Sequence, residues 1–386
     1  MSWIIPENKF GPVERLIIDE TMSLQNLCIK GSGSNQKSII LLYLIRNLLV
    51  NKINVRILLL VYNKLNKELY ESAFKEIGLR INVDTYFGFQ KAPKECDYIF
   101  CDNVQLITPS MLTEIANKSN IVIVTLDPYT IWEFDPLSRE RTVTMEILQN
   151  ILHPKIFELD DYSHLSPSLQ YVVSELLSDF PTKEIKKQLF KGDSNIRVCK
   201  AYTEDEEFVY IIKESYKALN VGYSVGIFLP THDRILSFIQ NVLLKDGKHI
   251  WDVKKNNYGR VDFGDLNCYL SSVGIPLQIL GSGYGQLADV HNKINVLTYY
   301  SLINLEFDIA FLPLLNTNLF INADEQISRN VFILAITRSR LDLYLTYNAI
   351  PHKYLDYFGN ISLKIDIHEA LLYDPQNAKN YGCCLF

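Results

Sequence analysis

The chain has 386 residues, a length that suits two domains of roughly 150 to 200 residues better than a single core. Hydrophobic residues make up 48% of it and charged residues 21%, a globular balance that excludes large-scale disorder. The formal net charge of −6 argues against a protein that coats nucleic acid through its overall charge, although a localised basic groove stays open.

The cysteines and the two ends of the chain bear on where the protein works. The seven cysteines are scattered and form no two-pair zinc pattern, which is typical of thiols in a reducing cytosol. Glu7 and Lys9 come too early for an uninterrupted signal-peptide core, and the longest apolar runs are too short to span a bilayer. We therefore expect a cytoplasmic protein without membrane association. Residues 383–386 (CCLF) have the form of a prenylation box, but an ordinary tail is the simpler interpretation.

The first half of the chain alternates apolar bursts with helical patterns. Strands are predicted at residues 26–31, 55–62, 81–89, 97–102 and 120–127, and helices at 38–52, 63–78 and from about 108. The pattern pauses at residues 153–168, where prolines and a polar cluster occur, so we place a domain boundary between about 165 and 195.

A second alternating set follows this pause. Strands are predicted at residues 195–202, 223–230, 294–300, 307–315, 329–340 and 341–348, and helices at 203–220 and 232–244. Alternation of strands and helices implies parallel pairing in doubly wound sheets, so the sequence predicts an α/β fold with two domains.

The segment GSGSNQKS joins the first predicted strand to the first predicted helix, which is the setting of a phosphate-binding P-loop. Lys37 and Ser38 fill the last two positions of the pattern G-x-x-x-x-G-K-[ST], where Lys reaches phosphate oxygens and Ser coordinates magnesium. Gly31 and Gly33 complete the candidate nucleotide-binding residues of this loop. The sixth position is Gln36 instead of glycine, and a side chain there crowds a phosphate that lies against the backbone. A Lys-Ser pair at the start of a solvated helix also arises by chance.

Further motifs follow in a recognisable order. DYIFCDN places Asp102 at the end of an apolar strand, and from this point the chain resembles the superfamily 1 helicases of the UvrD/Rep type. DNVQL resembles that family's D-E-x-Q-D motif, with Gln105 in the matching place, and VYNKLNKELY and VDTYFGF resemble the motifs around it. VLTYYSLINLEFDIAFLPLLN and NVFILAITRSRLDLYLTY resemble two motifs of the family's second domain. The resemblance covers nearly the whole chain.

The resemblance implies two RecA-like P-loop domains, residues 1–165 and 166–386, without large accessory insertions. It also implies ATP and Mg²⁺ as cofactors, with Ser38 and Asp102 as metal ligands and Asp102 and Arg338 as catalytic residues. Arg338 matches the family's arginine finger and Glu306 a ribose contact, with Lys37 and Arg338 on opposite walls of a cleft. Alternatively, Arg338 is a surface arginine after a buried strand, and Glu306 with Asp308 a solvated turn.

Several family residues are replaced in this chain. The general base that follows the metal-binding Asp is Asn103, and an amide cannot take a proton at neutral pH. Thr130 lies near the place of the γ-phosphate-sensing Gln, and Ser163 replaces an arginine. The Lys-Gly before L-E-F-D is Ile303 and Asn304. Tyr129 and Trp132 follow a strand end, where the family stacks bases, but core packing explains such aromatics more often.

We therefore expect a degenerate helicase-like protein that is a weak or inactive ATPase and acts as a nucleotide- or nucleic-acid-associated regulatory or structural subunit. Single-stranded DNA or RNA and a protein partner are the expected partners. The alternatives are an active ATP-dependent helicase or translocase with an atypical catalytic set, in which Asp127 replaces the missing base, and a nucleic-acid-binding scaffold without nucleotide.

Overall fold

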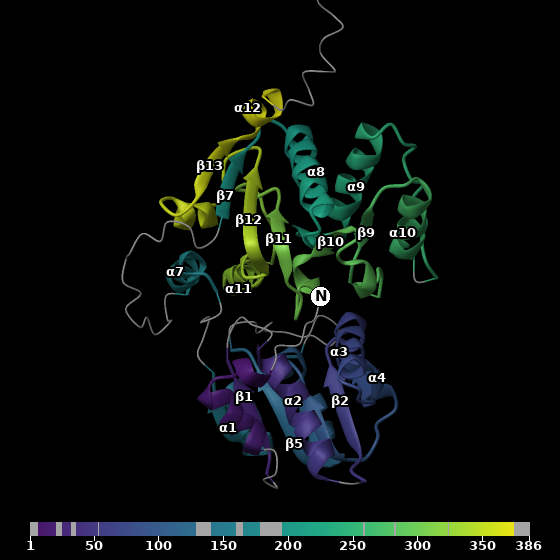
Figure 1. Cartoon of the computed structure of the whole chain (residues 1–386), viewed down its shortest axis with the longest axis vertical. Coiled ribbons are helices and arrows are strands. Elements are labelled where there is room, and N and C mark those ends of the chain that lie inside the picture. Colours follow the sequence, from purple (N-terminus) through teal and green to yellow (C-terminus); the bar gives the residue numbers. More distant parts are fainter. Residues whose placement is uncertain are drawn as a thin grey trace, which may run out of the picture. The chain divides into compact units, whose positions relative to one another are not determined.

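A computed structural model of the chain describes residues 7–20, 25–31, 36–52, 54–128, 140–159, 165–177, 195–257, 259–281, 283–322 and 324–373 (Figure 1). The chain divides into two compact units, Met1–His164 and Leu165–Phe386, and each is described by itself. The division falls beside residue 165, where the sequence predicts that the first domain ends.

The first unit is built on a six-stranded parallel sheet with the order β3-β2-β4-β5-β1-β6. Its strands are β1 (Leu27–Lys30), β2 (Ile57–Val61), β3 (Asn82–Thr85), β4 (Cys96–Cys101), β5 (Ser119–Leu126) and β6 (Lys155–Glu158). Its helices are α1 (Pro12–Glu20), α2 (Gln36–Asn51), α3 (Lys64–Glu76), α4 (Tyr86–Lys91), α5 (Pro109–Asn117) and α6 (Met145–Leu152), with 3-10 turns η1 (Glu7–Lys9) and η2 (Val104–Leu106).

Successive residues of a strand point to opposite faces of the sheet, and in this sheet both faces carry apolar side chains. Helices therefore cover both faces. On β1, Leu27 and Ile29 join a core that includes residues of α1, α2 and α3. Cys28, between them, joins a separate core with residues of α4, α5 and α6. The central strands β1, β2, β4 and β5 are mostly buried on both faces, which explains their nearly continuous apolar sequences.

The second unit contains a seven-stranded parallel sheet with the order β13-β7-β12-β11-β8-β10-β9. Its strands are β7 (Asn195–Lys200), β8 (Val225–Leu229), β9 (Leu277–Ile279), β10 (Ile294–Thr298), β11 (Phe307–Leu312), β12 (Ser339–Tyr347) and β13 (Leu363–Asp366). Its helices are α7 (Pro167–Leu176), α8 (Glu204–Asn220), α9 (His232–Lys245), α10 (Phe263–Ser272), α11 (Glu325–Ile336) and α12 (Ile367–Leu372), with 3-10 turns η3 (Leu287–Asp289), η4 (Tyr299–Ser301) and η5 (Lys353–Phe358). Both sheets are parallel throughout, so the predicted α/β fold class is confirmed.

Two predicted strands are partly or wholly wrong. The stretch 329–340 is mostly helix, because α11 ends at Ile336 and β12 begins only at Ser339. Its residues VFILAI are buried on every side, so no periodicity separates a helix from a strand there. In the stretch 81–89, the side chain of Thr85 accepts a hydrogen bond from the Gly88 N–H, which caps α4 and turns the second half of the predicted strand into helix.

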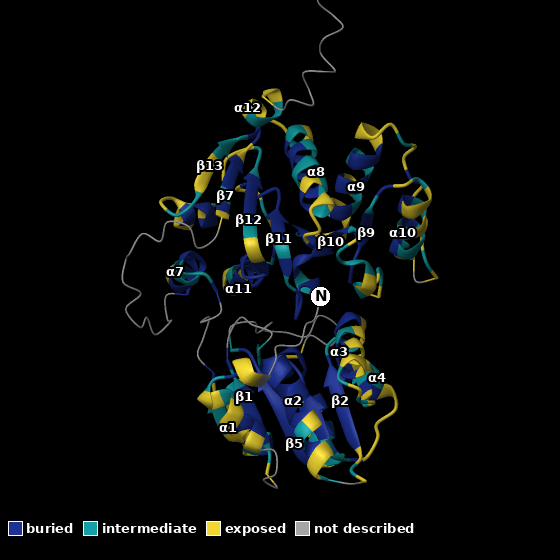
Figure 2. Cartoon of the chain, viewed as in Figure 1, coloured by how far each residue is buried: buried dark blue, intermediate teal, exposed yellow. Residues whose placement is uncertain are grey.

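Burial follows the two sheets, whose central strands are the most deeply buried parts of each unit (Figure 2). Among the described residues, no helix has both the length and the apolar character needed to cross a membrane.

Candidate functional site

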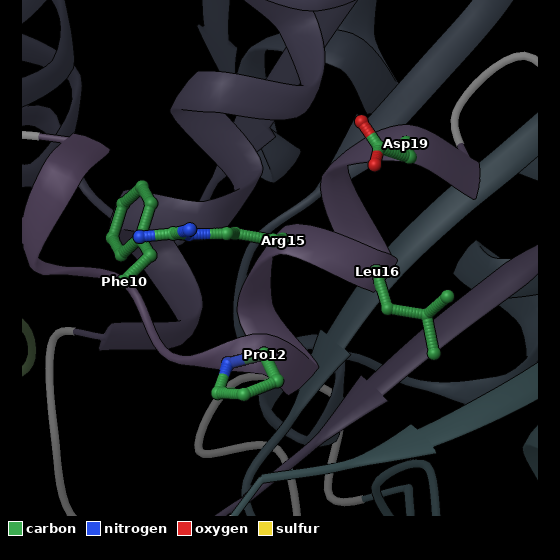
Figure 3. A pocket seen from close by; sticks show the side chains of 5 residues that line it. All are labelled: Phe10, Pro12, Arg15, Leu16 and Asp19. Carbon is green, nitrogen blue, oxygen red and sulfur yellow. The ribbon is translucent and has the colours of Figure 1, made fainter.

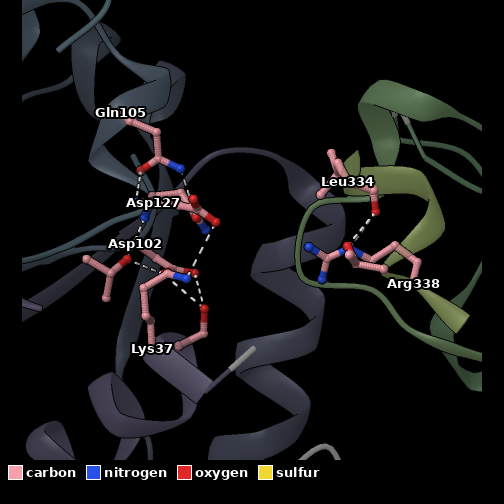
Figure 4. Close-up of polar contacts among 10 residues, drawn as sticks. Lys37, Asp102, Gln105, Asp127, Leu334 and Arg338 are labelled. Carbon is pink, nitrogen blue, oxygen red and sulfur yellow. Dashed lines mark hydrogen bonds and ion pairs between the residues drawn. The ribbon is translucent and has the colours of Figure 1, made fainter. Parts of the chain in front are cut away.

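Three neighbouring strands of the first unit bring the predicted phosphate and metal residues together. The sheet order places β5 between β4 and β1, and all three run parallel. Asp102 follows β4, Asp127 follows β5, and α2 with Lys37 and Ser38 begins after β1. Their carboxyl ends therefore meet at one edge of the sheet, which is where parallel α/β sheets bind ligands (Figure 4).

The carboxylate of Asp102 is the centre of this cluster. The Ser38 hydroxyl lies 3.0 Å from its Oδ1 and 2.9 Å from its Oδ2, and the hydroxyl of Thr125 donates to Oδ1 at 2.6 Å. Thr125 also accepts a hydrogen bond of 2.7 Å from the Asn103 N–H. All four side chains are buried, so the Asp102 carboxylate is held in one orientation by neighbouring strands and by the first turn of α2.

Lys37 forms a buried ion pair in the same cluster. Its Nζ lies 3.6 Å from Oδ2 of Asp127, and each residue is only 3% exposed. Gln105 connects the two strand ends, because its Oε1 accepts from the Asp127 N–H at 3.1 Å and its Nε2 donates to Oδ1 of Asn103 at 3.2 Å. Asp127 thus projects to the same edge as Asp102, as the sequence predicts for the end of that strand.

Asn103 occupies the position where the resemblance implies a general base. Its backbone is left-handed, with φ 59° and ψ 55°, and it precedes the turn η2. Asparagine adopts this conformation more readily than most residues, because its short polar side chain bonds locally. Its side-chain oxygen accepts a hydrogen bond from Gln105, so the amide has a structural role in the turn.

Two buried tyrosines that no sequence motif singles out contact the cluster. The Tyr86 hydroxyl donates to the Asp102 carbonyl at 2.9 Å, and the Tyr70 hydroxyl donates to the Ser38 carbonyl at 3.2 Å. Burial, and to a smaller extent nearby acidic groups, raises the pKa of both hydroxyls well above the ordinary range, so both stay protonated donors. Thr125 is also missed, although a threonine within an apolar strand is a signal that a polar partner lies beside it.

Of the two candidate glycines of the loop, the structure describes Gly31. Gly31 donates its N–H to the Leu126 carbonyl at 3.1 Å, and a Cβ there would lie 3.1 Å from Cβ of Leu159. Gly33 lies outside the described residues, as do Thr130 and Ser163.

Gln36 is the first residue of α2, and its amide Nε2 donates to the Glu14 carboxylate of α1. Its side chain therefore ties the end of the loop to the N-terminal helix.

The candidate residues of the second unit do not form one cluster among themselves. Glu306 pairs with Arg340, whose Nε lies 2.9 Å from its Oε2, at the starts of β11 and β12. The Arg338 side chain is 3% exposed and donates from Nε to the Leu334 carbonyl of α11 at 3.2 Å (Figure 4). The alternative of a surface arginine after a strand is therefore wrong.

Two neighbouring residues complete this region. Asp308 accepts from the N–H and the hydroxyl of Ser224 at 2.9 and 2.8 Å, so this segment is not a solvated turn. Asn304, which stands where the family has glycine, has φ 62°, a left-handed backbone that glycine and asparagine tolerate best.

A shallow hollow of about 500 Å³ lies on α1. Figure 3 shows its lining residues, Phe10, Pro12, Arg15, Leu16 and Asp19. None of the described residues of the Asp102 cluster lines it.

The Asp102 cluster offers a metal ion two protein oxygens of suitable chemistry. A Mg²⁺ ion is commonly held by one or two side-chain oxygens together with substrate phosphates and water, and the hydroxyl of Ser38 and the carboxylate of Asp102 are adjacent oxygens of that kind. Among the described residues there is no group of three or more His, Cys, Asp or Glu side chains that would form an all-protein metal site.

No protein-family model matches the chain, and no similar protein is found among curated sequences.

Proposed function

We propose that the protein binds a nucleoside triphosphate with Mg²⁺ weakly at the Asp102 cluster and hydrolyses it negligibly. In this proposal it is a degenerate relative of the UvrD/Rep-type helicases and acts as a nucleotide- or nucleic-acid-associated subunit beside a protein partner. The observation that carries the proposal is the pair of contacts from Ser38 to the Asp102 carboxylate, made beside the buried ammonium of Lys37.

The groups of this cluster suit a triphosphate and its metal. Ser38 and Asp102 supply hard oxygen ligands, and Lys37 supplies the positive charge that phosphate oxygens require. A bound Mg²⁺ would neutralise charge on the phosphates. The parallel-strand edge and the start of α2, a helix of 16 residues, add backbone N–H groups and a favourable dipole.

Binding should be weak because the ammonium of Lys37 already forms an ion pair within the protein. A phosphate must compete with the Asp127 carboxylate for the ammonium, and the negative charge of Asp127 repels it. Gln36 adds a side chain where the loop requires close approach of the backbone. Both effects lower affinity without removing the site.

Negligible hydrolysis follows from Asn103. Its amide cannot accept a proton from an attacking water, and loss of a positioned general base typically costs roughly 100- to 10,000-fold in rate.

The second candidate is an active ATP-dependent motor on nucleic acid, and one observation favours it. Asp127 presents a buried carboxylate beside Lys37 at the same strand edge, where it can serve as an alternative base. The retained Lys37, Asp102 and Arg338 are compatible with both candidates.

The two candidates are separated by measuring binding and turnover on the same preparation. Titration calorimetry with Mg·ATP should give weak binding that the Lys37→Ala variant abolishes. Phosphate release should stay at background with and without single-stranded DNA. Nanomolar affinity would contradict the weak-binding proposal, and turnover that requires Asp127 would establish the motor instead.

A further inference from the structure

The outward side of α1 exposes apolar side chains. Leu16 is 58% exposed and Val13 is 45% exposed, whereas Ile17 and Ile18 are buried in the core of the first unit. Pro12 lies one helical turn before Leu16 and is also exposed. Exposed apolar residues are ordinary when they occur singly, but these three are neighbours on one side of a helix of 9 residues.

The hollow of about 500 Å³ on α1 adjoins this apolar surface, because Pro12 and Leu16 line it together with Phe10 (Figure 3). Phe10 is buried and packs edge-to-face on Tyr43 of α2, with 4.9 Å between the ring centroids. Its ring is therefore held in place by the core. The hollow can receive an aliphatic side chain from another molecule, and such a contact removes apolar surface of both molecules from water.

Two opposite charges lie on one side of Leu16. Arg15 and Asp19 are four residues apart, so they share a side of the helix and lie about 6 Å apart along its axis. Both are exposed, and among the described residues neither forms an ion pair or a side-chain hydrogen bond. Figure 3 shows the Arg15 side chain extending toward Phe10 and not toward Asp19. Both charges therefore face solvent at the rim of the hollow.

The other carboxylates of α1 have partners inside the protein. Glu14 accepts a hydrogen bond from Gln36, and Glu20 lies 2.8 Å from Nζ of Lys155. Within the described part of the chain, Asp19 is thus the carboxylate of this helix that has no such partner.

A second copy of the chain carries the groups that this surface requires. A twofold axis level with the midpoint of Arg15 and Asp19 makes two α1 helices antiparallel. It places Arg15 of each copy opposite Asp19 of the other, so both charges gain a partner. Leu16 is one residue from that midpoint, so the two leucines meet beside the axis, each next to the hollow of the other copy.

We propose that this side of α1 is the contact between two copies of the chain in an antiparallel, twofold-symmetric dimer. Burial of Leu16 and the hollow supplies the apolar contact, and the two symmetric Arg15–Asp19 pairs fix the direction of packing. One short helix from each copy covers less area than a standard stable interface, and exposed ion pairs contribute little. The dimer therefore forms reversibly and depends on protein concentration. It does not rest on nucleotide binding, because none of these residues belongs to the Asp102 cluster.

Sedimentation equilibrium of the full chain between about 1 and 100 μM measures this association. The mass should rise from 44.6 kDa toward twice that value as the concentration increases. Leu16→Asp should weaken the association at least about tenfold, because it would bring a carboxylate into the apolar contact. Leu244→Asp is the matched control, since this leucine of α9 has nearly the same exposure, 56%, and its replacement should leave the association unchanged.

Charge reversal tests the direction of packing. Arg15→Asp and Asp19→Arg each place like charges opposite one another, so each variant alone should lose at least about tenfold in self-association. The double variant Arg15→Asp/Asp19→Arg should regain it. An equal mixture of the two single variants should also associate, because one copy then carries two carboxylates and the other two guanidinium groups. In the double variant an acid precedes a base by four residues, an order that suits an isolated helix better than the original, so unfolding would not explain a loss.

A parent that stays at the monomer mass over the whole concentration range would overturn the proposal, and the surface would then be left for another occupant. Equal loss in Leu16→Asp and Leu244→Asp would place the contact elsewhere. Single charge reversals that dimerise like the parent would exclude the Arg15–Asp19 pairs. A mixture of the folded single variants that remains monomeric would exclude the antiparallel arrangement. Circular dichroism of each variant establishes that it is folded.

Discussion

Lys37 and Asp127 form a buried ion pair across two neighbouring parts of the first sheet, with 3.6 Å between Nζ and Oδ2. Asp127 follows β5, and Lys37 lies in the first turn of α2, the helix after β1, so the pair lies at the carboxyl edge of the sheet. A carboxylate in this place holds the lysine in position and at the same time competes with any ligand that needs it.

The first prediction concerns this competition. Asp127→Asn should raise the affinity for Mg·ATP by roughly tenfold, which is about 1.4 kcal/mol, because the ammonium is no longer neutralised within the protein. The variant should also be destabilised by about 3 to 5 kcal/mol without ligand, since it leaves a buried charge without its partner. Calorimetry and denaturant unfolding measure the two effects.

Asp97→Asn is the matched control for this variant. It removes a carboxylate that pairs with Arg56 near the opposite end of β4, where both side chains are more exposed. Affinity for nucleotide should not change. Abolished phosphate release in Asp127→Asn, from a parent that turns ATP over, would instead make Asp127 the base.

A second prediction tests the hydrogen bonds that orient Asp102. Thr125→Val keeps the shape of the side chain but removes the donor to Asp102 and the acceptor of the Asn103 N–H. We expect a loss of about 1 to 3 kcal/mol in the free energy of unfolding, because two buried polar groups lose a partner. Thr125→Ser retains the hydroxyl and should recover most of the loss in urea unfolding. Equal stability of Thr125→Val and the parent would contradict the role assigned to this hydroxyl.

The sequence predicts which residues follow the strand ends in this cluster, but few of the hydrogen bonds that hold them in place. Asp102 and Asp127 end apolar runs, so their placement follows from strand periodicity and parallel topology. Thr125 and Tyr70 reach the cluster from within a strand and a helix, and their contacts depend on strand order and side-chain direction, which no local pattern encodes.

The misassigned helix α11 has a related cause. Its buried residues read equally well as strand, since a segment covered on all sides has no polar face to give a period. Asp324 accepts a hydrogen bond from the Ile327 N–H, which is the local signal for a helix start. To predict that Arg338 follows a helix, the helix start at Asp324 has to count for more than the β-branched and other apolar residues of α11, which favour a strand.

A third prediction returns to the phosphate loop. Gln36→Gly should improve Mg·ATP affinity, because the backbone then approaches the phosphate without a side chain. The same change removes the hydrogen bond to Glu14 and places glycine at the start of α2, so stability should fall by about 1 kcal/mol. Glu14→Ala breaks the same contact without changing the loop and should leave affinity unaltered. Equal affinity of Gln36→Gly and the parent in calorimetry would show that Gln36 does not crowd the ligand.

A fourth prediction concerns pH and the second unit. Glu207 of α8 is fully buried and accepts hydrogen bonds from the Leu314 N–H and from the side chains of Thr346 and Asn348. Burial raises its pKa above the ordinary 4.5, and the three donors only partly offset this. The folded protein therefore binds a proton more tightly than the unfolded chain, and this group's contribution to stability is lost as pH rises from about 4.5 through the raised value.

The measurement compares the free energy of unfolding of the parent and of Glu207→Gln between pH 4.5 and 7.5. Subtracting the two curves isolates Glu207, because every other carboxylate is common to both proteins. The parent should lose stability relative to the variant as pH rises. A constant difference across this range would contradict the raised pKa.

The fifth prediction is that Asn103→Glu alone restores little hydrolysis. A carboxylate returns to the position of the missing base, but Gln36 still crowds the loop, and Thr130 and Ser163 still stand at or near the places of the family's phosphate contacts. The backbone adds a further cost, because φ 59° suits asparagine and is unfavourable for glutamate by about 1 to 2 kcal/mol.

Phosphate release by the parent and by Asn103→Glu should both stay far below about 1 per second, the low end of typical enzyme rates. Asn103→Gln, which has the length of glutamate without its charge, separates the backbone cost from the chemistry in unfolding experiments. Turnover above that rate in the parent would mean that another group, Asp127 first among them, activates the water.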